Sequence, residues 1–503
     1  PEKIGGWQQL SLDDKTLPGV ARAVHNFTSL AGEAYTAIGT SQGLFLYYDE
    51  SFFDISPLDT ALTSCTFTTT NGSATVTINK TSHGLQAGRY ITLSSVGSLP
   101  GGGATGFSTT DFDGVVFEVQ SSTFTSLVLT MPSTETGTGM TAAGAVSIKP
   151  YVDFGPATQT FGYGWGTGLY GGSVTNPIQT TLNGALNADT AGTGGSGTSI
   201  TLTSVTGLPT SGVILVDNEL ITYSGISSND LTGITRGANG TATPGTSNGQ
   251  AHSNGATVTD ASNFTGFGSS SGTSSVILEP ANWSLDNFGQ QLIATIKNGR
   301  SFSWNPIAAD SNALQTRATV ISNAPTASVM SLVSDRDRHL FMFGTETTIG
   351  SPGTQDKLFI RFSDQEDTTN YTPTSVNTAG SFRLDSGTKI VGAVKGKDYT
   401  FVLTDTAAYV MQFVGPPFTF SVRQVGSNCG AIGQHSIKYV NGAVYWIGES
   451  GGFFVYDGTV KALPCLVEDF VFKTTGDNLG INYDASEEVY AGLNHLYEEI
   501  TWF

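Results

Sequence analysis

The sequence contains one pattern that could support covalent catalysis. Residues Gly448–Gly452 read GESGG, which fits the G-x-S-x-G arrangement of a nucleophilic serine. The same arrangement recurs at Gly39–Gly43, Gly245–Gly249 and Gly268–Gly272, as expected by composition alone in a chain rich in Gly and Ser. Ser450 also falls in an expected hairpin turn, where Gly and Ser are common residues. We therefore predict a turn at Ser450 rather than a catalytic site.

The other residues able to bind metals or transfer protons are dispersed. The six histidines form no H-E-x-x-H motif and no i, i+4 pair, and we expect His83 and His252, each near a glycine, to make local hydrogen bonds. Carboxylates cluster in three places: Asp111 with Asp113, Asp335 with Asp337, and Asp364 with Glu366 and Asp367. Because these clusters lack the spacing of calcium loops, we expect solvated loop carboxylates rather than a calcium or glycosidase site. We predict no enzymatic activity, no metal and no cofactor.

The composition favours strands and turns. Of the 503 residues, 38% are hydrophobic, 13% are charged and 63 are glycine. Gly, Ser, Thr and Asn supply the polarity, and these residues favour turns and strands over helices. The three cysteines, Cys65, Cys429 and Cys465, are too few for a disulfide framework. We expect buried free thiols, with a Cys429–Cys465 bridge as the alternative.

The chain is strongly acidic. Lys and Arg number 22 against 41 Asp and Glu, which gives a formal net charge of −19. Tight DNA binding needs a basic face that neutralises phosphates, so this balance argues against it. It is compatible with a wall past which DNA moves, because an acidic surface repels DNA. Without an apolar run of about 18 residues, no membrane-spanning helix is expected, and the start, PEKIGGWQQL, shows no signal peptide.

A repeated hairpin organises the chain. Each copy has a short apolar strand, a small polar turn and a second strand rich in aromatic residues. The copies are Ala34–Glu50, Gln291–Pro306, the pair His339–Gly344 and Lys357–Asp364, Phe401–Pro416, and Tyr445–Gly458. Units recurring about every 40–60 residues are typical of propeller blades, in which radial stacking covers both faces of each hairpin. We predict an all-β fold with a β-propeller core, closed by pairing of the two chain ends.

Two stretches interrupt this pattern. Both read as short strands with Gly-rich turns, and we expect each to form a small β-barrel or β-sandwich inserted at a loop. The expected organisation is a first blade region at 1–63, an inserted module at 64–148, a propeller-associated segment at 149–180, a second inserted module at 181–260 and the main blades at 261–503.

Several sequence blocks resemble a known family. They are Ala37–Pro57 (AIGTSQGLFLYYDESFFDISP), Trp283–Pro306 (WSLDNFGQQLIATIKNGRSFSWNP), Arg361–Leu384, Thr404–Ser436 and Gly451–Cys465. In order and character they are similar to the packaged-DNA-stabilisation proteins, also called tail hub or nozzle proteins, of short-tailed bacteriophages. The units at Thr81–Ile91 and Asp217–Gly237 also resemble modules common in phage tail proteins.

The resemblance implies a structural subunit of the virion. Six copies would form a homohexameric ring below the portal and adaptor proteins, next to tail fibres or spikes. The ring would retain packaged double-stranded DNA and conduct it during ejection without binding it specifically. A ring needs a repeated heterologous interface. The aromatic strip Gly162–Gly172, with Trp165 and Tyr170, is our candidate for the assembly contact.

Two other classes of protein compete with this interpretation. The first is a receptor-binding or glycan-binding phage tail protein, because exposed aromatics near acidic loops suit sugar stacking. The regularity of a long parallel β-helix, usual in tailspike depolymerases, is not found in the sequence. The second is a secreted bacterial propeller or surface adhesin, and an intracellular enzyme ranks last.

Overall fold

The computed structural model describes twelve stretches of the chain. They are residues 16–70, 72–94, 107–123, 125–132, 141–155, 178–188, 199–238, 241, 249–262, 279–306, 313–473 and 480–503. The chain divides into two compact units. The first comprises Pro1–Leu58, Val152–Thr160 and Leu278–Phe503, and the second comprises Asp59–Tyr151 and Phe161–Ile277.

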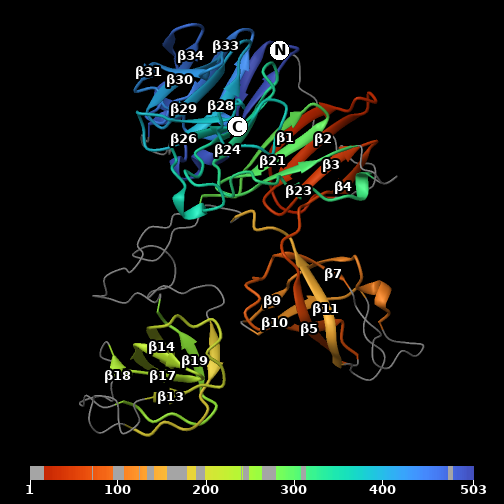
Figure 1. Ribbon diagram of the computed structural model, residues 1–503, viewed down its shortest axis with the longest axis vertical. Helices are drawn as coiled ribbons and strands as arrows, with labels where there is room; N and C mark the ends of the chain where they lie inside the picture. The colour runs from red at the N-terminus through yellow and green to blue at the C-terminus, as the bar shows by residue number, and fades with distance from the viewer. Residues whose placement is uncertain are drawn as a thin grey trace. The chain divides into compact units, whose positions relative to one another are not determined.

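The first unit is built from four-stranded antiparallel sheets, which we call blades 1 to 5 in chain order (Figure 1). Blade 1 contains β1 (Ala21–Thr28), β2 (Ala34–Thr40), β3 (Leu44–Tyr48) and β4 (Ser51–Asp54). Blade 2 contains β20 (Trp283–Phe288), β21 (Gln291–Ile296), β22 (Ser301–Trp304) and β23 (Thr319–Val320). Blade 3 contains β24 (Met330–Ser334), β25 (His339–Phe343), β26 (Phe359–Phe362) and β27 (Gly380–Arg383). Blade 4 contains β28 (Ile390–Lys395), β29 (Thr400–Thr404), β30 (Ala407–Gly415) and β31 (Thr419–Ser427).

Blade 5 contains β32 (Lys438–Val440), β33 (Ala443–Ile447), β34 (Phe453–Tyr456) and β35 (Val460–Leu463). A short helix, α1 (Glu468–Phe472), follows it. The last sheet, blade 6, has two strands among the described residues, β36 (Ala491–Asn494) and β37 (Glu499–Trp502).

The blades are arranged as a propeller. The first strand of each blade contacts the first strand of the next, in the order β1, β20, β24, β28, β32 and β36. An ion pair of 3.1 Å between Arg22 of β1 and Glu488, just before β36, links blade 1 to blade 6. The predicted hairpins are confirmed as the second and third strands of blades 1 to 5. The all-β fold with a propeller core is thus the fold of the chain.

Aromatic side chains fill the space between blades. Trp304 of blade 2 packs edge-on against Tyr35 of blade 1 at 5.5 Å between ring centroids, and Phe401 of blade 4 packs on Trp446 of blade 5 at 5.4 Å. The fully buried Trp283 donates its indole N–H to the carbonyl oxygen of Thr40 at 2.8 Å. A Cβ on Gly39 would lie 2.5 Å from Cγ of Trp283, so only glycine lets these two blades approach so closely.

The first inserted module is one seven-stranded antiparallel sheet. Its spatial order is β8 (Val116–Glu118), β7 (Tyr90–Ser94), β11 (Thr141–Pro150), β5 (Leu62–Thr69), β6 (Thr75–Asn79), β10 (Ser126–Thr130) and β9 (Ser121–Ser122). Alternating apolar residues of these strands form its own buried core, in which Phe67 and Phe112 lie 5.3 Å apart. A module with its own core suits an insertion, because it does not depend on the propeller for burial.

The second inserted module pairs a five-stranded with a three-stranded sheet. The larger has the order β12 (Gln179–Thr181), β19 (Thr257–Asp260), β14 (Gly212–Val216), β15 (Glu219–Tyr223) and β18 (Thr235–Ala238). The smaller has the order β13 (Ser199–Thr201), β17 (Asp230–Thr232) and β16 (Gly225–Ser227). Leu202, Ile214 and Leu231 are among the side chains buried in their common core.

The described ends of segment 149–180 have different partners. Near its start, the amide of Val152 donates to the carbonyl oxygen of Pro57, and Phe154 packs on Trp283 of the propeller. At its end, Gln179–Thr181 pairs with β19 of the second inserted module. All three cysteines are free, with Cys65 and Cys429 buried, so the alternative of a Cys429–Cys465 bridge is wrong.

Candidate functional site

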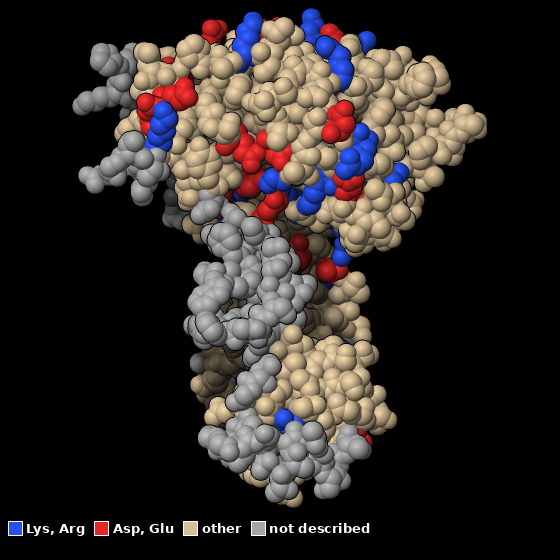
Figure 2. Space-filling view, turned by 90° about the vertical axis from the view of Figure 1, so that its left-hand side faces the viewer, with Lys and Arg blue, Asp and Glu red and all other residues tan. Residues whose placement is uncertain are grey.

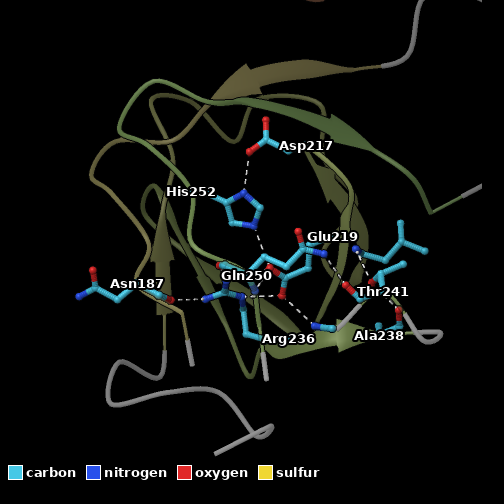
Figure 3. Close-up of polar contacts among 10 residues, drawn as sticks. Asn187, Asp217, Glu219, Arg236, Ala238, Thr241, Gln250 and His252 are labelled. Carbon is cyan, nitrogen blue, oxygen red and sulfur yellow. Dashed lines mark hydrogen bonds and ion pairs between the residues drawn. The ribbon is translucent and has the colours of Figure 1, made fainter. Parts of the chain in front are cut away.

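The most concentrated set of buried ionisable side chains lies in the second inserted module (Figure 3). Glu219, at the start of β15, accepts two hydrogen bonds of 2.8 Å from the guanidinium of Arg236 in β18. The backbone amides of Gly237 and Gln250 and Nε2 of His252 lie 2.8 Å from its carboxylate oxygens as well. The Glu219 side chain has no exposed surface. Five hydrogen bonds therefore compensate the loss of water around this carboxylate.

This environment determines the charge of Glu219. Burial by itself would raise the pKa of its carboxyl group, but the hydrogen bonds from Arg236, His252 and the two amides outweigh burial, and the pKa is lowered. The carboxylate consequently stays ionised and is a permanent counter-ion for Arg236. Because its hydrogen-bonding capacity is taken up inside the module, it joins strands rather than acting on a substrate.

One member of this network reaches solvent. Nδ1 of His252 lies 2.7 Å from Asp217, whose side chain is 58% exposed, whereas that of His252 is 1% exposed. We call Asp217, Glu219, Arg236 and His252 the clamp. Figure 3 shows His252 between the carboxylates of Asp217 and Glu219. The four side chains of the clamp bond one another inside the module, a geometry that fits a structural role.

The two histidines predicted to make local bonds behave differently. Nδ1 of His83 accepts from the amide of Leu85, two residues away, so the prediction is confirmed there. Nε2 of His83 also donates to the carbonyl oxygen of Thr123 at 2.6 Å. For His252 the prediction is wrong, since its partners lie 33 and 35 residues earlier in the sequence. The position of His252 in a predicted turn gave no indication of these long-range contacts.

His435, just before β32, bonds blade 5 to the start of blade 2. Nε2 of His435 lies 2.9 Å from Oδ1 of Asn282 and 3.0 Å from the carbonyl oxygen of Trp283. Burial lowers the pKa of His435 to about 4, so the ring is neutral at physiological pH. The neighbouring cavity, which Ser284, Ser331 and His435 help to line, measures about 130 Å³. This space holds a few water molecules and is far too small for DNA.

A second charged cluster ties three blades together. Lys297 lies 3.1 Å from Glu279 and 2.7 Å from Glu487, and Lys389 lies 3.2 Å and 3.5 Å from the same carboxylates. Burial favours a higher pKa for Glu279, but the two lysines outweigh it and lower the pKa to about 2. These residues precede β20, β28 and β36 or follow β21, so the cluster connects blades 2, 4 and 6.

A shallow cleft of about 160 Å³ lies between the first turns of blades 3 and 4. Lys395 bonds Asp335 at its rim at 2.9 Å, and Arg336 bonds Asp398 across it at 2.9 Å. On the face of the propeller seen in Figure 2, acidic and basic side chains lie beside one another rather than in patches of one sign. The charges around the cleft are thus largely neutralised in pairs.

The remaining residues singled out from the sequence have structural surroundings. Ser450 is exposed in the turn between β33 and β34, as predicted. Asp364 accepts hydrogen bonds from the amides of Gln365 and Thr378, and Asp367 accepts one from the amide of Thr369. In the described stretches, no group of three or more His, Cys, Asp or Glu side chains is placed to hold a metal ion. Trp165 and Tyr170, the candidate assembly contacts, lie outside the described residues.

Comparisons with known proteins leave the family open. No family model matches the chain, and no curated protein matches it. Among solved structures, the AfRom2 CNH domain is 10% identical, with a TM-score of 0.28 over 44% of this chain and 64% of that chain. AztD of Citrobacter koseri is 11% identical, with a TM-score of 0.23 over 88% of this chain and 93% of that one. The endosialidase of phage phi92 is 13% identical, with a TM-score of 0.17 over 95% and 63%.

The chain spans less than two thirds of the AfRom2 domain and of the endosialidase. TM-scores this low carry no argument about function. Within the described stretches, no helix has the length and apolar character needed to cross a bilayer.

Proposed function

We propose that the chain is a structural subunit of a short-tailed phage tail, a nozzle or hub ring that retains packaged DNA and conducts it during ejection. The observation that carries the proposal is that buried charged side chains of this β scaffold form ion pairs with one another. Glu219 pairs with Arg236 inside a module, and Glu487 pairs with Lys297 between blades 6 and 2. Such networks rigidify a fold without preparing a substrate site.

The charge of the chain suits a DNA conduit. With −19 per subunit, a ring of copies carries a large negative charge that disfavours adhesion of DNA. The cavity beside His435, lined by the innermost strands of blades 2 to 6, is about 130 Å³ and too small for DNA, so in this proposal the conduit is the axis of the ring rather than that of one propeller. The sequence blocks similar to the tail hub and nozzle proteins support the same assignment.

Loss of the gene product from the phage tests the proposal. Particles that assemble without the chain are expected to lose their packaged DNA, measured as genome resistant to DNase per capsid protein. A receptor-binding or glycan-binding tail protein would leave filled particles that fail to adsorb to cells. Filled, non-adsorbing particles would therefore contradict the nozzle function and favour the adhesin.

Imaging supplies an independent test. An antibody fragment against the second inserted module is expected to decorate a central ring on the tail axis in electron micrographs. Decoration of peripheral spikes would overturn the proposal. Pre-immune fragments at the same concentration give the background.

A further inference from the structure

A lysine and an asparagine side chain from neighbouring blades meet beside a carboxylate. Nζ of Lys357, between β25 and β26 of blade 3, contacts Oδ1 of Asn298, in the turn between β21 and β22 of blade 2. Nδ2 of Asn298 donates to Oε2 of Glu279 at 3.2 Å. An amine, a carboxamide and a carboxylate in contact are the two reactants and the proton carrier that a transamidation needs.

The orientation of the Asn298 amide follows from its neighbours. Nε2 of Gln355 donates to Oδ1 of Asn298 at 3.3 Å and to the carbonyl oxygen of Gly344 at 2.8 Å. Donors from Lys357 and Gln355 thus face the amide oxygen, and the acceptor Glu279 faces the amide nitrogen. The reverse orientation would set the amide N–H groups against two donors. The donors polarise the carbonyl group and stabilise negative charge that develops on Oδ1.

The backbone holds both partners in position. Asn298 adopts a left-handed conformation with φ of 58° in its turn. The amide of Ser328, in blade 3, donates to the carbonyl oxygen of Gly299 at 3.1 Å and so ties this turn to the next blade. The carbonyl oxygen of Lys357 accepts from the amide of Ile390, in blade 4, at 2.8 Å. A reaction between two groups held in contact is effectively unimolecular, which removes much of its entropic barrier.

The surroundings of Lys357 favour its neutral, nucleophilic form. Burial lowers the pKa of its ammonium group, and the positive charges of Lys297 and Lys389 lower it further. Glu279 and Glu487 act in the opposite direction, but the pKa stays below its ordinary value. Lys297 and Lys389 each bond both of these carboxylates, so their charges remain beside Lys357. Desolvation and neighbouring cations are the conditions that make a lysine a good nucleophile.

We propose that Lys357 and Asn298 form an isopeptide bond that joins blade 2 covalently to blade 3. Nζ of Lys357 attacks Cγ of Asn298, and the electron pair of the carbonyl bond moves to Oδ1, where Gln355 donates. Glu279 takes a proton from Nζ and delivers it to Nδ2. The Nζ–Cγ bond forms, the Cγ–Nδ2 bond breaks and ammonia leaves. One amide replaces another, so no oxidant or reductant is needed.

The bond stabilises the propeller independently of the proposed function. It links residues 298 and 357, and β22, β23, β24 and β25 lie between them. A covalent link across this segment restricts the unfolded chain, as a disulfide does. Blades 2 and 3 then remain connected even when the noncovalent contacts between them are broken.

The mass of the purified wild-type chain tests the proposal directly. The cross-linked chain is expected to be about 17 Da lighter than its sequence, the mass of one ammonia molecule. Trypsin does not cleave after an acylated lysine, so residues 339–361 should stay joined to residues 298–300 in one branched peptide. Tandem mass spectrometry identifies this peptide. A chain of full mass that yields the peptides separately overturns the isopeptide bond.

Variants separate the roles of the three groups. Lys357→Met and Asn298→Ala should each show the full mass of their sequences. Glu279→Gln keeps both reactants but removes the proton carrier, and bond formation should slow about 100-fold, followed as the lighter fraction at successive times after induction. Reaction of Glu279→Gln at the wild-type rate would overturn that role. Lys461→Met is the matched control, because Lys461 is exposed and pairs with Asp457, and it should keep the mass loss.

A different loss of ammonia is distinguished by the same variants. Asn298 precedes Gly299, and a succinimide formed within such a pair also removes about 17 Da, but it leaves Lys357 unmodified. A mass loss that persists in Lys357→Met, together with normal cleavage after Lys357 in the wild-type chain, would identify the succinimide and overturn the cross-link. The DNase and imaging tests do not depend on this bond, so its failure leaves the nozzle function untouched.

Discussion

Nε2 of His252 lies 2.8 Å from a carboxylate oxygen of Glu219, although the side chains of both residues are almost completely shielded from solvent. Arg236 bonds the same carboxylate from a neighbouring strand. The clamp thereby joins β15, β18 and the segment that leads to β19. From the buried ion pair of Glu219 and Arg236 we predict how substitutions change the stability of the second inserted module.

Glu219→Gln should destabilise the second inserted module strongly. The substitution leaves Arg236 buried without its counter-charge, which costs about 3–5 kcal/mol of unfolding free energy. Asp217→Asn is the matched control, because Asp217 is 58% exposed and its loss should cost about 1 kcal/mol or less. Calorimetric transitions of the purified chain report both values. Equal effects of the two substitutions would contradict a clamp centred on Glu219.

Acid should weaken the propeller through Glu279. Its pKa in the folded protein is lowered from 4.5 to about 2, because Lys297 and Lys389 outweigh the effect of burial. A depressed carboxyl pKa contributes stability above the unfolded value, and that stability is lost as the pH falls from 4.5 towards 2. The contribution is about 3 kcal/mol. Denaturant titrations over this range should show a shallower pH slope for Glu279→Gln than for wild type, and equal slopes would contradict the prediction.

His435 should make the stability of the propeller depend on pH between 6.5 and about 4, a higher range than that of Glu279. Burial lowers its folded pKa from 6.5 to about 4, so the unfolded chain takes up a proton before the folded one. Stability is then complete above pH 6.5 and falls as the pH drops towards 4. His435→Gln should remove this dependence, as measured by unfolding free energies at pH 7, 6, 5 and 4. An unchanged slope in His435→Gln would argue against a neutral buried ring.

Gly39→Ala should loosen the contact between blades 1 and 2. The new Cβ would lie 2.5 Å from Cγ of Trp283, whose indole is fixed by Thr40, so the blades must separate. Overpacking of this kind costs about 1–3 kcal/mol. Gly353→Ala adds a Cβ with no neighbour within 4 Å and should be nearly neutral. Thermal unfolding followed by tryptophan fluorescence compares the two, and similar melting temperatures would refute the close approach.

Much of the propeller could be predicted from local pattern. The hairpins at Ala34–Glu50 and Tyr445–Gly458 are recognisable because alternating apolar residues and turn residues lie within one short stretch. Blade 6 could not be counted in the same way. Its strands have four residues each, and the turn between them, HLYE at 495–498, contains neither Gly nor Pro. Only their contact with blade 5, through Trp502 and Phe453, identifies them as a blade.

The contacts within the clamp could not be predicted from the sequence either. The sequence places Asp217, Glu219 and Arg236 in one unit and His252 in a separate turn, and it predicts only local bonds for His252. Folding of the module brings residues 33 and 35 positions apart within 2.8 Å. Nothing in the spacing of single residues encodes that proximity.

By itself, the sequence determined the all-β class, the hairpin units and the acidic charge, because these properties depend on residue type and short-range periodicity. The tertiary structure alone decided which carboxylates are paired, that His435 bonds Asn282 and Trp283, and that the first strands of the six blades meet in chain order. Those features depend on which faces meet after folding, and burial of apolar surface selects among many faces that are locally equivalent.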